Sequence, residues 1–324
     1  MTRRRFVKFA MAAWIGMGIS MPAPGQSIYP AKTIRFVVPF APGGGTDYLA
    51  RLIALKLTES MGQPVIVDNR AGGGGIAGAD IVAKSPPDGY TILLGSPGSL
   101  SINPNFTKTP YDPLRDFTPL TLATLSPFAV AAHSAVPASS VKELIALAKS
   151  RPGTLNYGTA GTGSAGHFSG EYFRMLTGIN IVHVPYKGSA LSSTAVLSGE
   201  LQLTFENLPI VLPLARGGKM KILGVGSTTR SLLAPEIPTI AETVPGYESV
   251  TAFGVLAPAK LPAAITKRLH DELVKALNES KISDQLASRG MQTATNAPAE
   301  YAEFLRREHM RYGDIIKKTG ITID

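Results

Sequence analysis

The stretch VPFAPGGGTDYLA, residues 38–50, joins an apolar run to three consecutive glycines and then to a helix-like segment. A glycine-rich turn between a strand and a helix exposes backbone N–H groups at the positive end of the helix dipole, so the loop is predicted to bind an anion. Thr46 is predicted to cap the helix, Asp47 to lie in its first turn, and Gly62 to end it. Asp47 is explained by that position alone, and direct contact with a ligand is the alternative.

Apolar, β-branched runs recur along the chain and are separated by helix-length segments with 3.6-residue spacing. This alternation is typical of an α/β fold with mostly parallel sheets. Further helices are predicted to begin near Ser164 and Ser189, and at Ser140, which forms a capping box with Glu143. The predicted strands cover residues 34–40, 65–68, 91–94, 129–132, 155–158, 181–185, 201–205, 222–226 and 253–257.

Nine strands are many for one continuous sheet in a chain of 324 residues. Two nearly uncharged, extended segments, residues 122–132 and 249–257, are predicted to cross between two lobes. The first lobe then comprises residues 28–124 together with 252–324, and the second comprises residues 125–251. Two lobes joined in this way leave a cleft that can hold a ligand.

The N-terminus has the features of an export signal. Three arginines at positions 3–5 and Lys8 precede a charge-free run over residues 9–21. That run is shorter than the ~20 residues that a membrane-spanning helix needs, which favours a signal peptide over residues 1–26. The arginines resemble the twin-arginine export motif, so the mature protein is expected in the periplasm. An N-terminal anchor that is not cleaved is the alternative.

Composition and charge exclude several classes of function. The chain has no cysteine, which excludes disulfides, thiolate metal sites and cysteine nucleophiles. Without residues 1–26 the formal net charge falls from +9 to +5, because that segment holds four basic and no acidic residues. The remaining basic residues are dispersed, so no nucleic-acid-binding surface is predicted. The five histidines are too far apart for a local metal motif, and each is expected to be a satisfied or exposed side chain.

Three loops are predicted at the carboxyl ends of strands, where open α/β sheets bind their ligands: residues 39–47, 157–167 and 184–189. Glycines in the second loop match a dinucleotide-binding fingerprint, but the acidic residue expected about 20 positions later is absent. The loops offer backbone N–H groups, hydroxyls, one amide and one cation, which together suit a carboxylate. The side chains predicted to contribute are Thr46, Ser96, Ser99, Thr159, Thr162, Ser164, Lys187 and Asn207.

Seven blocks of sequence, in order, resemble those of the Bug-type, tripartite tricarboxylate transporter substrate-binding family. They include VVPFAPGGGTDYLARLIALKL at residues 37–57, LNYGTAGTGSAGHFSGEYF at residues 155–173 and IVHVPYKGSA at residues 181–190. The resemblance covers residues 28–324 and implies a periplasmic binding protein of the two-lobed, type II or Venus-flytrap fold, without a cofactor. It also implies that the protein delivers a small organic anion to a membrane permease.

The resemblance further implies which residues hold the ligand. In the family, two glycine-rich loops grip a ligand carboxylate largely through backbone groups and ordered waters. The ligands are di- and tricarboxylates, acidic amino acids or aromatic acids. Carried onto this chain, and with Ser96 and Asn207 added from the loop analysis, the predicted ligand-binding residues are Gly43, Gly44, Thr46, Asp47, Ser96, Thr159, Ala160, Gly163, Ser164, Tyr186, Lys187, Gly188 and Asn207.

The sequence therefore predicts a monomeric, non-enzymatic binding protein for transport, and two other functions stay open. An exported enzyme acting on small organic acids would need a base near the loops, for which only His167 and Asp47 are available. A subunit of a sensor system would present its ligand to a kinase.

Overall fold

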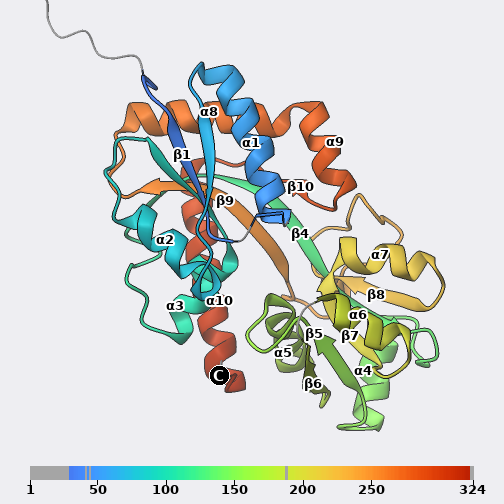
Figure 1. Cartoon of the computed structure of the whole chain (residues 1–324). Coiled ribbons are helices and arrows are strands. Elements are labelled where there is room, and N and C mark those ends of the chain that lie inside the picture. Colours follow the sequence, from blue (N-terminus) through green and yellow to red (C-terminus); the bar gives the residue numbers. More distant parts are fainter. Residues whose placement is uncertain (1–28, 41, 44, 187–188, 322–324) are drawn as a thin grey trace, which may run out of the picture.

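The computed structural model describes residues 29–40, 42–43, 45–186 and 189–321 (Figure 1). The predicted signal peptide, and Gly44, Lys187 and Gly188 of the predicted site, lie outside these residues. The strands are β1 (Ile34–Val38), β2 (Val65–Asn69), β3 (Thr91–Gly95), β4 (Phe117–His133), β5 (Asn156–Thr159), β6 (Val182–Pro185), β7 (Leu203–Asn207), β8 (Met220–Val225), β9 (Val250–Pro258) and β10 (Gln292–Thr293).

Helices follow most of these strands. The α-helices are α1 (Gly45–Met61), α2 (Ile76–Ala83), α3 (Asn103–Phe106), α4 (Val141–Ser150), α5 (Ala165–Thr177), α6 (Ser189–Leu197), α7 (Leu208–Arg216), α8 (Ala263–Asn278), α9 (Ser280–Ser288) and α10 (Pro298–Thr319). Short helical turns are η1 (Gly73–Gly75), η2 (Gly98–Ile102) and η3 (Ile240–Glu242). No helix in the described ranges is both long and apolar enough to span a membrane.

The first part of the sheet has the strand order β2-β1-β3-β9-β4, with β10 paired to β4. Strands β1, β2 and β3 are parallel, whereas β9 is antiparallel to both of its neighbours. Successive side chains of β1 point to opposite faces, as the period of a strand requires. Phe36 packs against α1, α8 and α9 on one face, and Val37 packs against α2 and α10 on the other.

The second part of the sheet is built on the other half of β4. Strands β7 and β8 both pair antiparallel with it, and β5 and β6 continue from β7 in parallel. One face of this part packs against α4, α5 and η3, around Tyr157 and Phe205. The other face packs against α6 and α7, around Val196 and Leu208. Each part of the sheet therefore has its own hydrophobic core on both faces.

The two parts form a two-lobed α/β fold, as predicted, and β4 passes through both lobes (Figure 1). The prediction of mostly parallel sheets is wrong, because β4 and β9 run antiparallel to the strands beside them. Residues 117–127 of β4 pair with β9, whereas residues 128–133 pair with β7 and β8. This change of partners supports the predicted division into a first lobe of residues 28–124 and 252–324 and a second lobe of residues 125–251. The exact boundaries stay a prediction.

Helix α10 belongs to the first lobe and also packs against α5 of the second. Tyr312 meets the ring of Phe168 edge-on, with 5.3 Å between the ring centroids. The neighbouring Arg311, which pairs with the buried carboxylate of Glu308, lies beside Tyr172 of α5, with its guanidinium 5.6 Å from the centre of that ring. These contacts connect the lobes on the side of α10.

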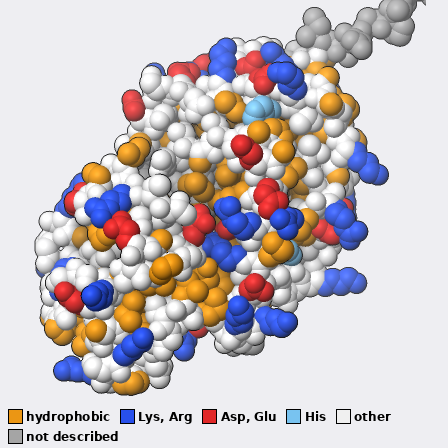
Figure 2. Space-filling view, turned by 180° about the vertical axis from the view of Figure 1, so that it is seen from behind, with side chains coloured by type: hydrophobic (Ala, Val, Ile, Leu, Met, Phe, Trp, Pro, Cys, Tyr) orange, Lys and Arg blue, Asp and Glu red, His pale blue; other side chains and the backbone are white. Residues whose placement is uncertain are grey.

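Seen from behind, lysine, arginine, aspartate and glutamate side chains are interspersed across the surface (Figure 2). Hydrophobic side chains gather toward the middle of this face. The charged residues visible there do not form a single basic patch.

All nine predicted strands are present, and the helix starts predicted at Ser140, Ser164 and Ser189 lie within one residue of those observed. Thr46 does not cap α1 as predicted, because the helix begins at Gly45 and Thr46 lies in its first turn. Ser140 accepts a hydrogen bond from the N–H of Glu143, as predicted. The second half of the predicted capping box differs, because the carboxylate of Glu143 accepts from the N–H of Ser139 and not from Ser140. The short strand β10 was not predicted, since its two polar residues carry no apolar pattern.

Candidate functional site

The predicted site residues lie where parallel strands end and helices begin. The loop after β1 carries Gly43 and leads into α1, while β5 ends at Thr159 and the loop after it leads into α5. Strands β5, β6 and β7 run parallel, so their carboxyl ends meet at one edge of the second lobe. The first-lobe loop belongs to the other part of the sheet. That the two loops face one ligand remains a prediction.

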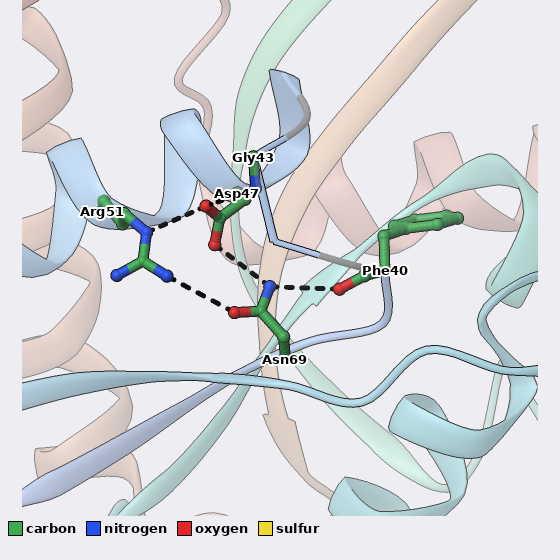
Figure 3. A network of polar contacts seen from close by, with 5 residues as sticks. All are labelled: Phe40, Gly43, Asp47, Arg51 and Asn69. Atoms are coloured by element: carbon green, nitrogen blue, oxygen red, sulfur yellow. Dashed lines mark hydrogen bonds and ion pairs between the residues drawn. The ribbon is translucent and has the colours of Figure 1, made fainter.

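The loop before α1 is held by the carboxylate of Asp47 (Figure 3). Oδ2 accepts from the N–H of Gly43 at 3.0 Å and from Nε of Arg51 at 2.8 Å, and Oδ1 accepts from the amide of Asn69 at 3.0 Å. The same Asn69 amide donates to the carbonyl of Phe40 at 3.0 Å. Asp47 thus ties the ends of β1 and β2 to the first turn of α1, and both of its oxygens are engaged.

This network leaves other donors of the loop for a ligand. The N–H groups of Gly45 and Thr46 are in the first turn of α1, where the helix itself supplies no acceptor. Gly43 has a φ of +89°, and no heavy atom lies within 4 Å of the position that a Cβ would take. The backbone here is therefore open on the side that a side chain would occupy.

Asp47→Ala is expected to lower the free energy of unfolding at pH 7 by about 1–3 kcal/mol, because Gly43, Arg51 and Asn69 lose their hydrogen bonds to a charged, buried carboxylate. The hydrogen bond from Arg51 is the main reason that the pKa of Asp47 falls from 3.8 to about 2. A lowered pKa means that the carboxylate stabilises the fold above about pH 4 and that this contribution is lost as the pH falls toward 2.

Urea unfolding at pH 7 and about pH 2.5 checks this prediction, since wild type and variant should differ less in acid. Asp271→Ala is the matched control, because Asp271 also pairs with a basic residue four positions away, Lys267, but on an exposed surface. Little change is expected for the control. Equal losses in the two variants would contradict a structural role for Asp47.

The loop before α5 is also ordered by hydrogen bonds within itself. The N–H of Gly161 donates to Oγ1 of Thr159 at 3.2 Å, and the N–H of Gly163 donates to Nδ1 of His167 at 3.1 Å. Ser164 caps α5 by accepting from the N–H of His167 at 3.2 Å, so the hydroxyl of this predicted ligand-binding residue is engaged with the helix. Thr159 is fully buried, so its side chain holds the loop from the protein interior.

The other predicted site residues are partly engaged with the protein. Ser96 is buried and shares hydrogen bonds with Ser99 in the turn after β3. The side-chain oxygen of Asn207 accepts from the hydroxyl of Thr251 at 3.1 Å, which joins the end of β7 to β9. The N–H of Tyr186 donates to the carbonyl of Thr159 at 3.1 Å, which brings the loops after β5 and β6 together.

The residues considered as a base for catalysis are both occupied. Asp47 has its two oxygens engaged, and Nδ1 of His167 already accepts a hydrogen bond from the backbone. Within the described part of the chain, no three side chains of His, Asp or Glu come together as a metal site. Among the described residues, the arrangement offers hydrogen-bond donors to an anion, and the two side chains considered as a base each have a hydrogen-bond partner.

The model of one protein family, the tripartite tricarboxylate transporter family receptor, matches residues 49–321. The chain belongs to this family. It is 35% identical to the protein BugT of Bordetella pertussis over 311 residues, which is 94% of each chain. This assignment agrees with the family resemblance of the sequence blocks.

Two solved structures of relatives are similar over almost their whole length. Rpa4515 of R. palustris, solved with adipate, is 38% identical, with a TM-score of 0.75 over 91% of this chain and 99% of that one. A TctC solute-binding protein from Polaromonas, solved without ligand, is 28% identical, with a TM-score of 0.83 over 90% of this chain and 99% of that one. This member of the tripartite tricarboxylate transporter receptor family therefore has the fold of its solute-binding relatives.

In this family member, sequence reasoning missed two features beside the loops. His167 was expected only to be a satisfied or exposed side chain, but it is 6% exposed and stacks on His183. Glu206, next to Asn207 at the end of β7, is buried, and burial raises the pKa of its carboxyl. A histidine three residues after a helix-capping serine is a local signal that could have indicated the first feature.

Proposed function

We propose that this protein is an extracytoplasmic solute-binding protein that captures a small organic carboxylate between its lobes and delivers it to a membrane permease. The observation that carries the proposal is the prearranged loop before α1, in which Asp47 consumes the N–H of Gly43 and leaves the first N–H groups of α1 for an anion. A relative that holds adipate supports a carboxylate as the ligand class. The proposed site comprises the predicted residues of both lobes, among which Asp47 and Gly163 act by holding their loops. The protein acts in the periplasm after export by its N-terminal signal.

Closure of the lobes would couple ligand capture to recognition by the permease. A carboxylate would shift the balance toward a closed state by binding that state more tightly.

A role in sensing would use the same binding step, with a sensor kinase in place of the permease. Membership of a family of transporter receptors favours delivery to a permease. An enzymatic role would need a free base near the loops. The engagement of Asp47 and His167 argues against one. We therefore propose a non-enzymatic monomer that releases its ligand unchanged.

The proposal predicts that an organic acid raises the melting temperature of the purified protein. Binding to the folded state alone stabilises it by about 2.7 kcal/mol when the ligand is at 100 times its dissociation constant, which corresponds to a shift of several degrees. Adipate, citrate, glutamate and nicotinate would be compared at saturating concentration, and native mass spectrometry would identify any acid that co-purifies. No shift with any acid, and no co-purified anion, would contradict the proposal.

A further inference from the structure

Two histidines form a stacked pair directly beneath the loop before α5. The ring planes of His167 on α5 and His183 on β6 lie 11° from parallel, with 3.8 Å between their centroids. Each ring also reaches the loop, because Nδ1 of His167 accepts from the N–H of Gly163 and Nε2 of His183 lies 2.7 Å from Oγ1 of Thr159. The pair therefore contacts both ends of the loop.

Both imidazoles are neutral at neutral pH. Burial lowers the pKa of His167, and burial together with His167 and Arg174 lowers the pKa of His183 to about 3. Nδ1 of His167 carries no proton, since it accepts from an N–H, so the proton of the neutral ring is on Nε2. The charged groups facing the pair are Glu171 and Arg174 of α5, which bond to each other and, through Glu171, to the hydroxyl of Tyr157.

The pair determines which donors of the loop stay available. The N–H groups of Gly161 and Gly163 are used inside the loop, by Thr159 and His167. Within the described ranges, the N–H groups of Ala160 and Thr162 have no hydrogen-bond partner. These alternate residues are the ones that can offer N–H groups to an anion.

We propose that His167 and His183 are positioning residues that, as a stacked neutral pair, hold residues 159–164 in the conformation that presents the N–H groups of Ala160 and Thr162 to the ligand's carboxylate. This assignment rests on the proposed function. It corrects the prediction that the N–H of Gly163 is itself a ligand donor, because that group is already bound to His167. The two rings act on the ligand only through the loop.

The test compares two replacements of similar size at one position. His167→Asn keeps an acceptor near the place of Nδ1, whereas His167→Leu removes it. Hydrogen exchange of the Gly163 amide, measured without ligand, should stay slow in wild type and His167→Asn and become fast in His167→Leu. With the acid that gives the largest melting shift as the probe, affinity should fall about tenfold in His167→Leu and stay within about twofold in His167→Asn.

The pH dependence of Gly163 hydrogen exchange is a second measurement, and a merely structural role of His167 would not change it. Protonation of His167 removes its acceptor, so acid should speed Gly163 exchange in wild type relative to His167→Asn at the same pH. Slow Gly163 exchange in His167→Leu, or loss of affinity in His167→Asn as large as in His167→Leu, would overturn the proposal. Wild type that binds no acid while Gly163 behaves as expected would instead overturn the proposed function, and with it the role of the loop as an anion site.

Discussion

Gly43→Val is expected to weaken carboxylate binding by more than about 100-fold. The space beside Gly43 is open, so a valine side chain would extend to where a ligand carboxylate is proposed to lie. Gly43 also has a φ of +89°, a conformation that costs a residue with a Cβ about 1–2 kcal/mol. The variant should therefore be somewhat less stable and should not bind. Isothermal titration calorimetry with the acid from the thermal screen measures the loss.

Gly62→Val separates loss of binding from loss of stability. Gly62 follows the other end of α1, has a φ of +71°, and likewise has no heavy atom within 4 Å of a Cβ. Both variants should lose similar stability, because both place valine in the left-handed region. Only the variant at Gly43 should lose affinity. Normal binding by Gly43→Val, or equal loss by both variants, would show that this loop does not hold the ligand.

The sequence predicted the fold well because the fold depends on local patterns. Each lobe is built from short apolar strands that alternate with amphipathic helices, and this alternation is visible in any window of the chain. The crossing segments were predicted because residues 122–132 and 249–257 are extended and almost uncharged, and they correspond to parts of β4 and β9. Strand β10 carries no such pattern, because it consists of Gln292 and Thr293 and exists only through its pairing with β4.

The site was predicted less completely, because its organisation depends on residues that are distant in sequence. Asp47 was understood as a helix-start residue, but its contact with Asn69 follows from the pairing of β1 with β2. The stack of His167 on His183 follows in the same way from the register of β5 with β6, which places Tyr157 opposite His183. Glycine loops can be recognised in the sequence by their spacing. The side chains that hold those loops can be identified only when the register of the sheet is known.

Lobe closure requires close contact between the lobes, and at Gly290 the backbone of the first lobe meets a side chain of the second. Gly290 ends α9 in the first lobe with a φ of +70°, and a Cβ there would lie 1.7 Å from Cγ of Pro209 in the second lobe. Pro209 is the second residue of α7, the helix that begins directly after the carboxyl end of β7. A proline ring cannot rotate away as a flexible side chain could. Any side chain at position 290 must therefore push α7 away from α9.

Gly290→Ala is accordingly expected to oppose lobe closure and to raise the dissociation constant of the ligand about 30-fold, which corresponds to a shift of about 2 kcal/mol against the closed state. Small-angle scattering should show that the ligand-saturated variant stays more extended than the ligand-saturated wild type. Gly62→Ala is the matched control, because its φ of +71° imposes the same backbone strain without a neighbour within 4 Å. If Gly290→Ala lost no more affinity than Gly62→Ala and compacted normally with ligand, the contact with Pro209 would not limit closure. If only Gly290→Ala loses affinity, the carboxylate is bound by a state in which the lobes approach each other at this point.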